Sequence, residues 1–167
     1  ARPVLLPLER PIVARIATIK DWPLILIDLE TEEGITGRSY LEPYIPRTVE
    51  YLVRAIHDLG ALLKGTQVAP TELFDLARKS LHFVGYEGLS AIAVSGLDMA
   101  AWDALAKAAD QPLCELLGGS VGAVRAYNSN GLWLQEPPVV ADEAAVLIEE
   151  GQFTGLKLRL GRDRSAD

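Results

Sequence analysis

The chain has 167 residues, of which 49% are hydrophobic, and carries a formal net charge of −7 at pH 7. This composition predicts a packed core and excludes a disordered protein, while the negative charge argues against binding to nucleic acid or to an anionic membrane surface. Cys114 is the single cysteine, so neither an internal disulfide nor a cysteine metal cluster can form. No signal-peptide pattern or spanning apolar run stands out, and we therefore expect a cytoplasmic protein.

The first third of the chain predicts a hairpin. Residues 24–42, LILIDLETEEGITGRSYLE, read as two strands around a turn, because apolar residues alternate on both sides of Glu33 and Gly34. The preceding stretch, residues 7–23, has prolines at both ends and an irregular apolar pattern. We expect it to be a loop that is long enough to form a flap.

The middle of the chain predicts helices. Apolar residues recur at a period near 3.6 over residues 47–64, and Thr71 can cap a second helix. Residues 90–109 form a third predicted helix that is apolar on more than one face and therefore buried. Gly96 inside it indicates close packing, and a short helix is expected after Pro112.

The last quarter of the chain has a different pattern. Residues 124–132, VRAYNSNGL, and 154–160, TGLKLRL, predict two strands with a helix over residues 142–151 between them. Strands joined in this way are parallel, with a right-handed crossover. The sequence thus predicts an α+β domain over residues 1–120, followed by the start of an α/β domain over residues 121–167.

The last predicted strand carries two cations among leucines. Residues i and i+2 of a strand point to the same side, so Lys157 and Arg159 would share one face while Leu156, Leu158 and Leu160 share the other. Any half-exposed strand can show this pattern. The spacing alone is therefore also compatible with a charged face that simply lies in solvent.

Five stretches, in this order, carry a resemblance: IDLETEEGITGRSYLEPYIP, GYEGLSAIAVSGLDMAAWDALAK, QPLCELLGG, AYNSN and GLKLRLG. They are similar to the enolase superfamily and, within it, to the mandelate racemase subgroup, and the most specific element is GLDMAAWDALAK at residues 96–107. The resemblance implies an α+β capping domain that covers the mouth of a (β/α)8 barrel of the TIM type. Only the first β-α-β unit of such a barrel would lie in this chain, because a whole barrel needs about 250 residues.

The resemblance also implies a cofactor. In this superfamily Mg²⁺ stabilises the enediolate that forms when a base removes the proton α to a carboxylate. The acidic metal ligands and the catalytic histidine would come from beyond Asp167, so no metal ligand is expected in this chain. We therefore expect the 167-residue chain alone to be inactive.

The resemblance assigns roles to individual residues. Lys157 matches the first lysine of the family's K-x-K motif, which neutralises the substrate carboxylate, and Arg159 stands where the motif has its second lysine, the α-proton base. Arginine stays protonated in proteins, so Arg159 is a poor base and a good electrostatic clamp. Ser129 aligns with a serine that binds the carboxylate, and Asn130 lies beside it. The residues expected to line the pocket from the capping domain are Tyr44 and, in the flap, Ile12, Val13, Ile16, Ile19 and Trp22.

Several of these side chains also have a structural interpretation. Ser129 by itself could be a turn residue, and Tyr44 could be a surface ring that pins a loop. Other conspicuous residues are expected to be structural, with backbone hydrogen bonds for Asp98 and Asp103, structural or exposed positions for His57 and His82, and a small core position for Cys114.

The arginine at position 159 favours a one-base reaction over a two-base racemase. We expect the parent protein to be a lyase that removes the α proton of a small hydroxy-carboxylate and expels its β hydroxyl, as an acid-sugar dehydratase does. An isomerase of the mandelate racemase type is the alternative within the superfamily. From another class, the chain could be a non-catalytic binding module built from a capping-domain homologue. Homo-oligomers are common in this family, so self-association is expected.

Overall fold

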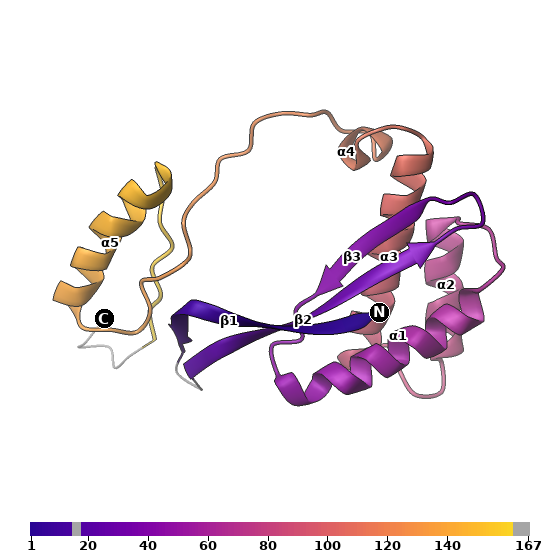
Figure 1. The fold of residues 1–167 in the computed structure, drawn as a ribbon, viewed down its shortest axis with the longest axis horizontal. Coiled ribbons are helices and arrows are strands. Elements are labelled where there is room, and N and C mark those ends of the chain that lie inside the picture. Colours follow the sequence, from indigo (N-terminus) through magenta and orange to yellow (C-terminus); the bar gives the residue numbers. More distant parts are fainter. Residues whose placement is uncertain (15–17, 162–167) are drawn as a thin grey trace. The chain divides into compact units, whose positions relative to one another are not determined.

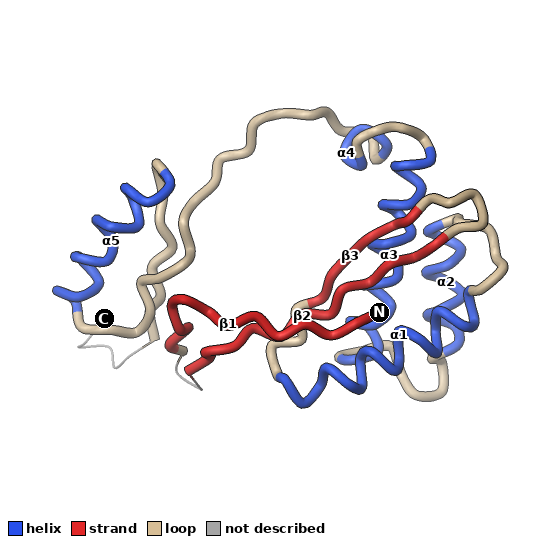
Figure 2. The backbone as a smooth tube through the Cα atoms, in the orientation of Figure 1, coloured by secondary structure: helices blue, strands red, loops and turns tan. Residues whose placement is uncertain are grey.

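The computed structural model describes residues 1–14 and 18–161. The chain forms two compact units: unit 1 comprises Ala1–Leu6 and Pro23–Val121, and unit 2 comprises Pro7–Trp22 and Gly122–Asp167. Figures 1 and 2 show the elements, which are β1 (Arg2–Val13), β2 (Thr18–Glu30), β3 (Thr36–Leu41), the 3-10 helix η1 (Pro46–Thr48), α1 (Val49–Leu63), α2 (Pro70–Ser80), α3 (Leu89–Ala108), α4 (Leu113–Leu116) and α5 (Pro137–Gly151).

The predicted hairpin is confirmed. The three strands lie in the order β1-β2-β3, and β2 pairs antiparallel with β3, with Ile25 opposite Leu41. The turn closes where the N–H of Gly34 donates to the carbonyl oxygen of Thr31 at 3.1 Å. Gly34 has φ +81°, a conformation that glycine adopts without steric cost.

The prediction of a loop over residues 7–23 is wrong. β1 continues to Val13 and β2 begins at Thr18, so most of this stretch is strand. From Leu8 to Val13, half-buried and exposed residues alternate with the period of two that a strand requires. Pro11 is tolerated because β1 lies at the edge of the sheet, where a missing N–H removes no interior ladder bond.

Helix α3 is the core helix of unit 1, as predicted for residues 90–109. It packs against β3, α1 and α2, and its length and composition alone would also suit a membrane span. Eight of its residues are buried within the fold, however, which accounts for its apolar composition. Gly96 allows close packing as predicted, since a Cβ there would lie 2.5 Å from Cδ1 of Ile27 and 2.9 Å from Cδ1 of Leu41.

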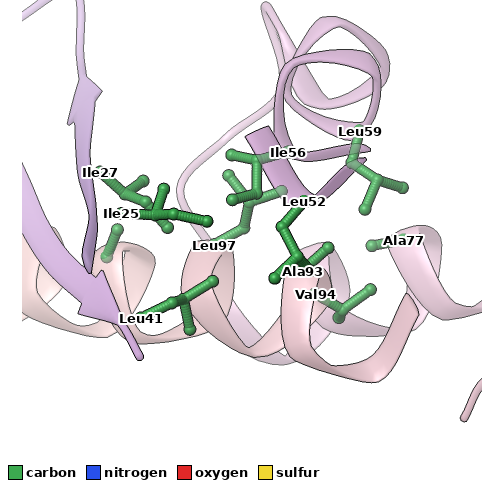
Figure 3. Packing of buried hydrophobic residues seen from close by; sticks show 11 residues of the cluster. Ile25, Ile27, Leu41, Leu52, Ile56, Leu59, Ala77, Ala93, Val94 and Leu97 are labelled. Carbon is green, nitrogen blue, oxygen red and sulfur yellow. The ribbon is translucent and has the colours of Figure 1, made fainter. Parts of the chain in front are cut away.

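Figure 3 shows how the apolar faces of the strands and helices of unit 1 meet in one cluster. Burial of such surface contributes roughly 25 cal/mol per Å², so this cluster is the main source of stability in unit 1. Its buried members are Ile25 and Ile27 from β2, Leu41 from β3, Leu52, Ile56 and Leu59 from α1, Ala77 from α2, and Ala93, Val94, Leu97 and Ala100 from α3.

Two local predictions in unit 1 are wrong. Thr71 does not cap α2, because the helix begins at Pro70 and its N-cap is Ala69 in an extended conformation. The fixed φ of proline suits the first helical position, and the helix therefore begins two residues earlier than a Thr71 cap would imply. Cys114 is exposed rather than in the core, since the short α4 has no buried residue.

Other polar side chains of unit 1 have the structural roles that were predicted. Asp103 Oδ2 accepts a hydrogen bond from the backbone N–H of Arg38 at 2.6 Å and another from Lys107 Nζ at 2.5 Å. His57 Nε2 lies 3.0 Å from the carbonyl oxygen of Ala1 at an exposed position, and His82 is exposed.

In unit 2 the predicted order of segment, helix and segment is present, but neither of the two segments forms a strand within the described residues. A single parallel bridge, between Asn128 and Leu156, joins the two segments that were predicted as strands. Their parallel direction is confirmed at this bridge, while the predicted strand lengths are wrong. Side chains of Asn128, Glu143 and Arg159 bind backbone groups of the first segment. Helix α5 begins at Pro137, five residues before the predicted start, since proline suits the first turn.

Candidate functional site

The candidate site in unit 2 is built on two segments that the parallel bridge holds together. The N–H of Asn128 donates to the carbonyl oxygen of Gly155 at 3.0 Å, and the N–H of Lys157 donates to the carbonyl oxygen of Asn128 at 3.0 Å. Because the bridge with Leu156 is parallel, the residues that follow it lie at the same end. Ser129 and Lys157 are therefore brought to one end of the paired segments.

Arg159 binds the backbone of the first segment. Its Nη1 donates to the carbonyl oxygen of Gly131 at 2.7 Å, and its Nη2 donates to that of Ser129 at 3.1 Å. The guanidinium carbon lies 3.7 Å from the centroid of the Trp133 ring, which is a cation–π contact. Burial lowers the pKa of Arg159 from its ordinary value and interaction with Tyr127 opposes that change; arginine nevertheless remains a cation.

These contacts define what Arg159 can do chemically. A guanidinium has donors and no acceptor, and two of its N–H groups are directed at backbone carbonyl oxygens. Such a group cannot accept a proton, and its contacts fix the shape of the Ser129–Trp133 segment. The predicted role as a clamp on the substrate stays a prediction, and holding the backbone is an additional role that the spacing did not indicate.

Glu143, from α5, also binds this segment. Its Oε2 accepts hydrogen bonds from the N–H of Leu132 at 2.9 Å and from Gln135 Nε2 at 3.3 Å. Leu132 is buried and has φ +53°, an uncommon conformation for a leucine. A Cβ at position 131 would lie 2.8 Å from Glu143 Oε1, so Gly131 permits this close approach. No sequence pattern indicated Glu143, because it resembles any charged residue on a helix surface.

Asn128 is the one buried polar side chain in the part of the chain that the structure describes, with 7% of its surface exposed. Its Oδ1 accepts the N–H of Asn130 at 2.9 Å, and its Nδ2 donates to the carbonyl oxygen of Leu147 at 3.2 Å. Sequence reasoning missed this residue, although an asparagine that bonds to the N–H two residues on is typical of a turn. Ser129 and Asn130 are exposed on a backbone that Asn128, Glu143 and Arg159 hold in place.

The other predicted site residues are only partly placed. Lys157 is exposed beyond the bridge. Val13 and Trp22 belong to the N-terminal segment of unit 2, whereas Tyr44 belongs to unit 1, where it is 63% exposed with φ +57°. Ile16 lies outside the described residues. A single pocket that joins these residues stays a prediction.

The leucines near Arg159 do not form a buried face in the described part of the chain. Leu158 is 53% exposed and Leu160 is 67% exposed, while Arg159 between them is half-buried. The alternation of leucines and cations therefore does not correspond to alternating buried and exposed side chains at residues 158–160. The hydrogen bonds of Arg159 explain why the charged side chain is the more enclosed one.

A metal site is not formed by the residues that the structure describes. Within residues 1–14 and 18–161, no group of three histidine, cysteine, aspartate or glutamate side chains is placed to hold a metal ion. Mg²⁺ prefers a set of oxygen ligands, so the residues present do not fit such a site.

Known proteins resemble the chain over most of its length. L-talarate/galactarate dehydratase of Salmonella typhimurium is 36% identical over 172 residues, which covers 97% of this chain and 42% of that protein. Arabinonate dehydratase of Saccharolobus solfataricus is 29% identical over 145 residues, which covers 83% of this chain and 37% of that protein. The chain thus spans less than half the length of these curated relatives.

Solved structures show the same fold. An enolase from alpha proteobacterium bal199, with bound magnesium, is 65% identical with a TM-score of 0.93, covering 99% of this chain and 46% of that one. An enolase from Bradyrhizobium, in complex with magnesium and mandelic acid, is 36% identical with a TM-score of 0.84, covering 94% of this chain and 43% of that one.

The family assignment rests on the N-terminal region. The family model described as mandelate racemase / muconate lactonizing enzyme, N-terminal domain, matches residues 2–118. This match confirms the predicted α+β capping domain, whose three-stranded sheet and helices lie within that range. The chain belongs to the mandelate racemase / muconate lactonizing enzyme family of the enolase superfamily.

Proposed function

We propose that this chain is the N-terminal part of a Mg²⁺-dependent acid-sugar dehydratase. The observation that carries the proposal is Arg159, a permanent cation at the position of the family's second lysine, with its guanidinium engaged by Ser129, Gly131 and Trp133. A site that lacks a base at this position favours a reaction with one base, such as dehydration. The curated relatives named as arabinonate and L-talarate/galactarate dehydratases support this class of substrate.

The residues of this chain would bind and orient the substrate. The exposed ammonium of Lys157 would neutralise the carboxylate and so favour loss of the α proton, while Ser129 and Asn130 would donate hydrogen bonds to it. Arg159 would fix the backbone that carries these donors. The capping-domain side of the pocket would be formed by Tyr44, Trp22, Val13 and Ile16.

The remaining parts of the site would come from elsewhere in the full-length enzyme. Mg²⁺ would supply stabilisation of the enediolate, and neighbouring structures that contain magnesium support its presence in the family. Residues 1–120 would form the capping domain, and residues 121–167 would open the barrel. A cytoplasmic location and a homo-oligomeric assembly complete the proposal.

A racemase of the mandelate type is the second candidate. The Bradyrhizobium enolase, 36% identical to this chain, was solved with mandelic acid, an α-hydroxy acid without a β hydroxyl to expel. A racemase needs proton transfer on both faces of the α carbon, and therefore a second base in place of Arg159.

The test is a substrate screen of the full-length protein with Mg²⁺. Aldonic acids, aldaric acids and mandelate would be incubated in D₂O, with detection of 2-keto acid product and of deuterium in recovered substrate. Formation of a 2-keto acid from an acid sugar is expected. Deuterated mandelate of inverted configuration would favour the racemase, and no reaction in the presence of Mg²⁺ would favour a non-catalytic module.

A further inference from the structure

Arg10 and Glu150, which have no predicted role, form a bidentate ion pair in unit 2. Arg10 Nη1 donates to Glu150 Oε2 at 2.9 Å, and Arg10 Nη2 donates to Glu150 Oε1 at 2.8 Å. The side chains are 40% and 41% exposed. Two parallel N–H···O bonds fix the orientation of both groups, which a single contact between exposed charges would not do.

The position of Glu150 explains why a cation is needed there. It lies one residue before the end of α5, where the helix dipole is negative and a carboxylate is unfavourable. The last turn of α5 contains no basic residue of its own. Arg10 supplies the positive charge, and its hydrogen bonds lower the pKa of the Glu150 carboxyl.

The pair connects the N-terminal segment of unit 2 to the candidate site. Arg10 lies on the half-buried face of β1, three residues before Val13. Glu150 Oε2 also lies 3.5 Å from Nδ2 of the buried Asn128, whose Oδ1 accepts the N–H of Asn130. A continuous set of polar contacts therefore runs from β1 through the end of α5 to the segment that carries the predicted carboxylate donors.

We infer that Arg10 and Glu150 are positioning residues, which fix residues 7–13 of β1 relative to the Asn128–Leu132 segment so that the pocket keeps its shape. Neither residue is proposed to contact the reacting atoms. The inference rests on the proposed function for its effect on substrate binding. Its structural part, the fixing of β1 by α5, does not depend on any activity.

A double-mutant cycle in the full-length protein tests the inference. Arg10→Met and Glu150→Gln remove the charges with little change in size, and the double variant removes both. Each single change is expected to raise KM about fivefold with kcat nearly unchanged, because it weakens substrate binding rather than a contact made only in the transition state. Amide hydrogen exchange within residues 7–14 should become faster by a similar factor.

The double variant should be no worse than the more affected single variant, because the pair is already broken. The matched control is the exposed pair of Arg54 and Asp58 in α1, 3.0 Å apart, changed to Met and Gln. Its loss should alter neither KM nor exchange within residues 7–14.

Two results would overturn the inference: single variants with unchanged exchange within residues 7–14, or effects of the two changes that simply multiply. If the wild-type protein dehydrates no acid sugar, the proposed function fails, and exchange still decides the role of the pair. Coupled exchange effects would then support the positioning of β1, and their absence would refute it.

Discussion

The two units of this protein are stabilised in different ways. Unit 1 is held by apolar side chains from two strands and three helices that meet in one cluster. The described part of unit 2 has only Leu132 and Leu147 as buried hydrophobic residues, and its segments are joined by polar side chains that bind the backbone. The comparison shows that apolar packing can stabilise one region of a chain while a few hydrogen bonds between side chains and backbone stabilise another.

The largest effect is expected where unit 1 is most tightly packed. A Cβ at Gly37 would collide with the carbonyl oxygen of Ala100 and lie 2.7 Å from Cβ of Ala104, so Gly37→Ala should reduce the free energy of unfolding by about 2 kcal/mol. The control is Gly60→Ala in α1, which has open space around it. Alanine favours a helix, so this change should stabilise by about 0.7 kcal/mol.

Chemical denaturation of the full-length protein, followed by a probe in unit 1, would measure both variants. Equal effects of the two glycine substitutions would contradict the idea that close contact of β3 with α3 determines stability there.

A smaller effect is expected from the polar contacts of unit 2. Asn128→Ala removes the acceptor of the Asn130 N–H and the donor to Leu147, and should cost about 1.5 kcal/mol. Asn130→Ala changes an exposed side chain nearby and should alter stability by less than about 0.5 kcal/mol. Hydrogen exchange over residues 128–133 would measure the difference, and a similar response of both variants would remove the special role of Asn128.

The smallest effect concerns two carboxylates of α3 with opposite behaviour. Burial alone would raise the pKa of Asp103, but hydrogen bonds from Lys107 and from the N–H of Arg38 outweigh it and lower the pKa. Burial raises the pKa of Asp98, and a hydrogen bond from Trp102 opposes that only in part. At pH 7, Asp103→Asn should therefore destabilise by about 1 kcal/mol, while Asp98→Asn should stabilise.

The pH dependence follows from the direction of each change in pKa. The stabilisation by Asp103 is present above the ordinary pKa of 3.8 and is lost as the pH falls through the lowered value in the folded state. The difference between wild type and Asp103→Asn should shrink below pH 3.8 in thermal unfolding. A difference that stays constant down to pH 2.5 would show that the charge of Asp103 is irrelevant.

The same division between the units decides what could be predicted from the sequence. Periodicity predicted α1, α3 and the hairpin of unit 1, because apolar burial leaves a repeating pattern along the chain. The prolines of residues 7–23 led to the wrong prediction of a loop in place of β1, because a proline in an edge strand cannot be told from a proline in a loop by sequence alone.

In unit 2 the sequence indicated that position 159 matters but did not reveal its partners. The contacts of Arg159, Glu143 and Asn128 join residues 11 to 30 positions apart, or lie within a turn, and depend on where α5 and the last segment lie. No local pattern encodes such contacts. The sequence can therefore indicate that Arg159 is important, but its role in holding the backbone is seen only in the folded structure.

We propose that position 159 holds the backbone of a one-base site and does not transfer protons. The direct test compares the full-length wild type with Arg159→Lys, with Mg²⁺ and an acid sugar in D₂O. We expect 2-keto acid formation by the wild type without a deuterated epimer of the substrate. We also expect slower dehydration by the lysine variant, because one ammonium cannot replace the two-pronged contact with Ser129 and Gly131. A deuterated epimer formed by the wild-type protein would show that protons are transferred on both faces of the α carbon and would refute the one-base site.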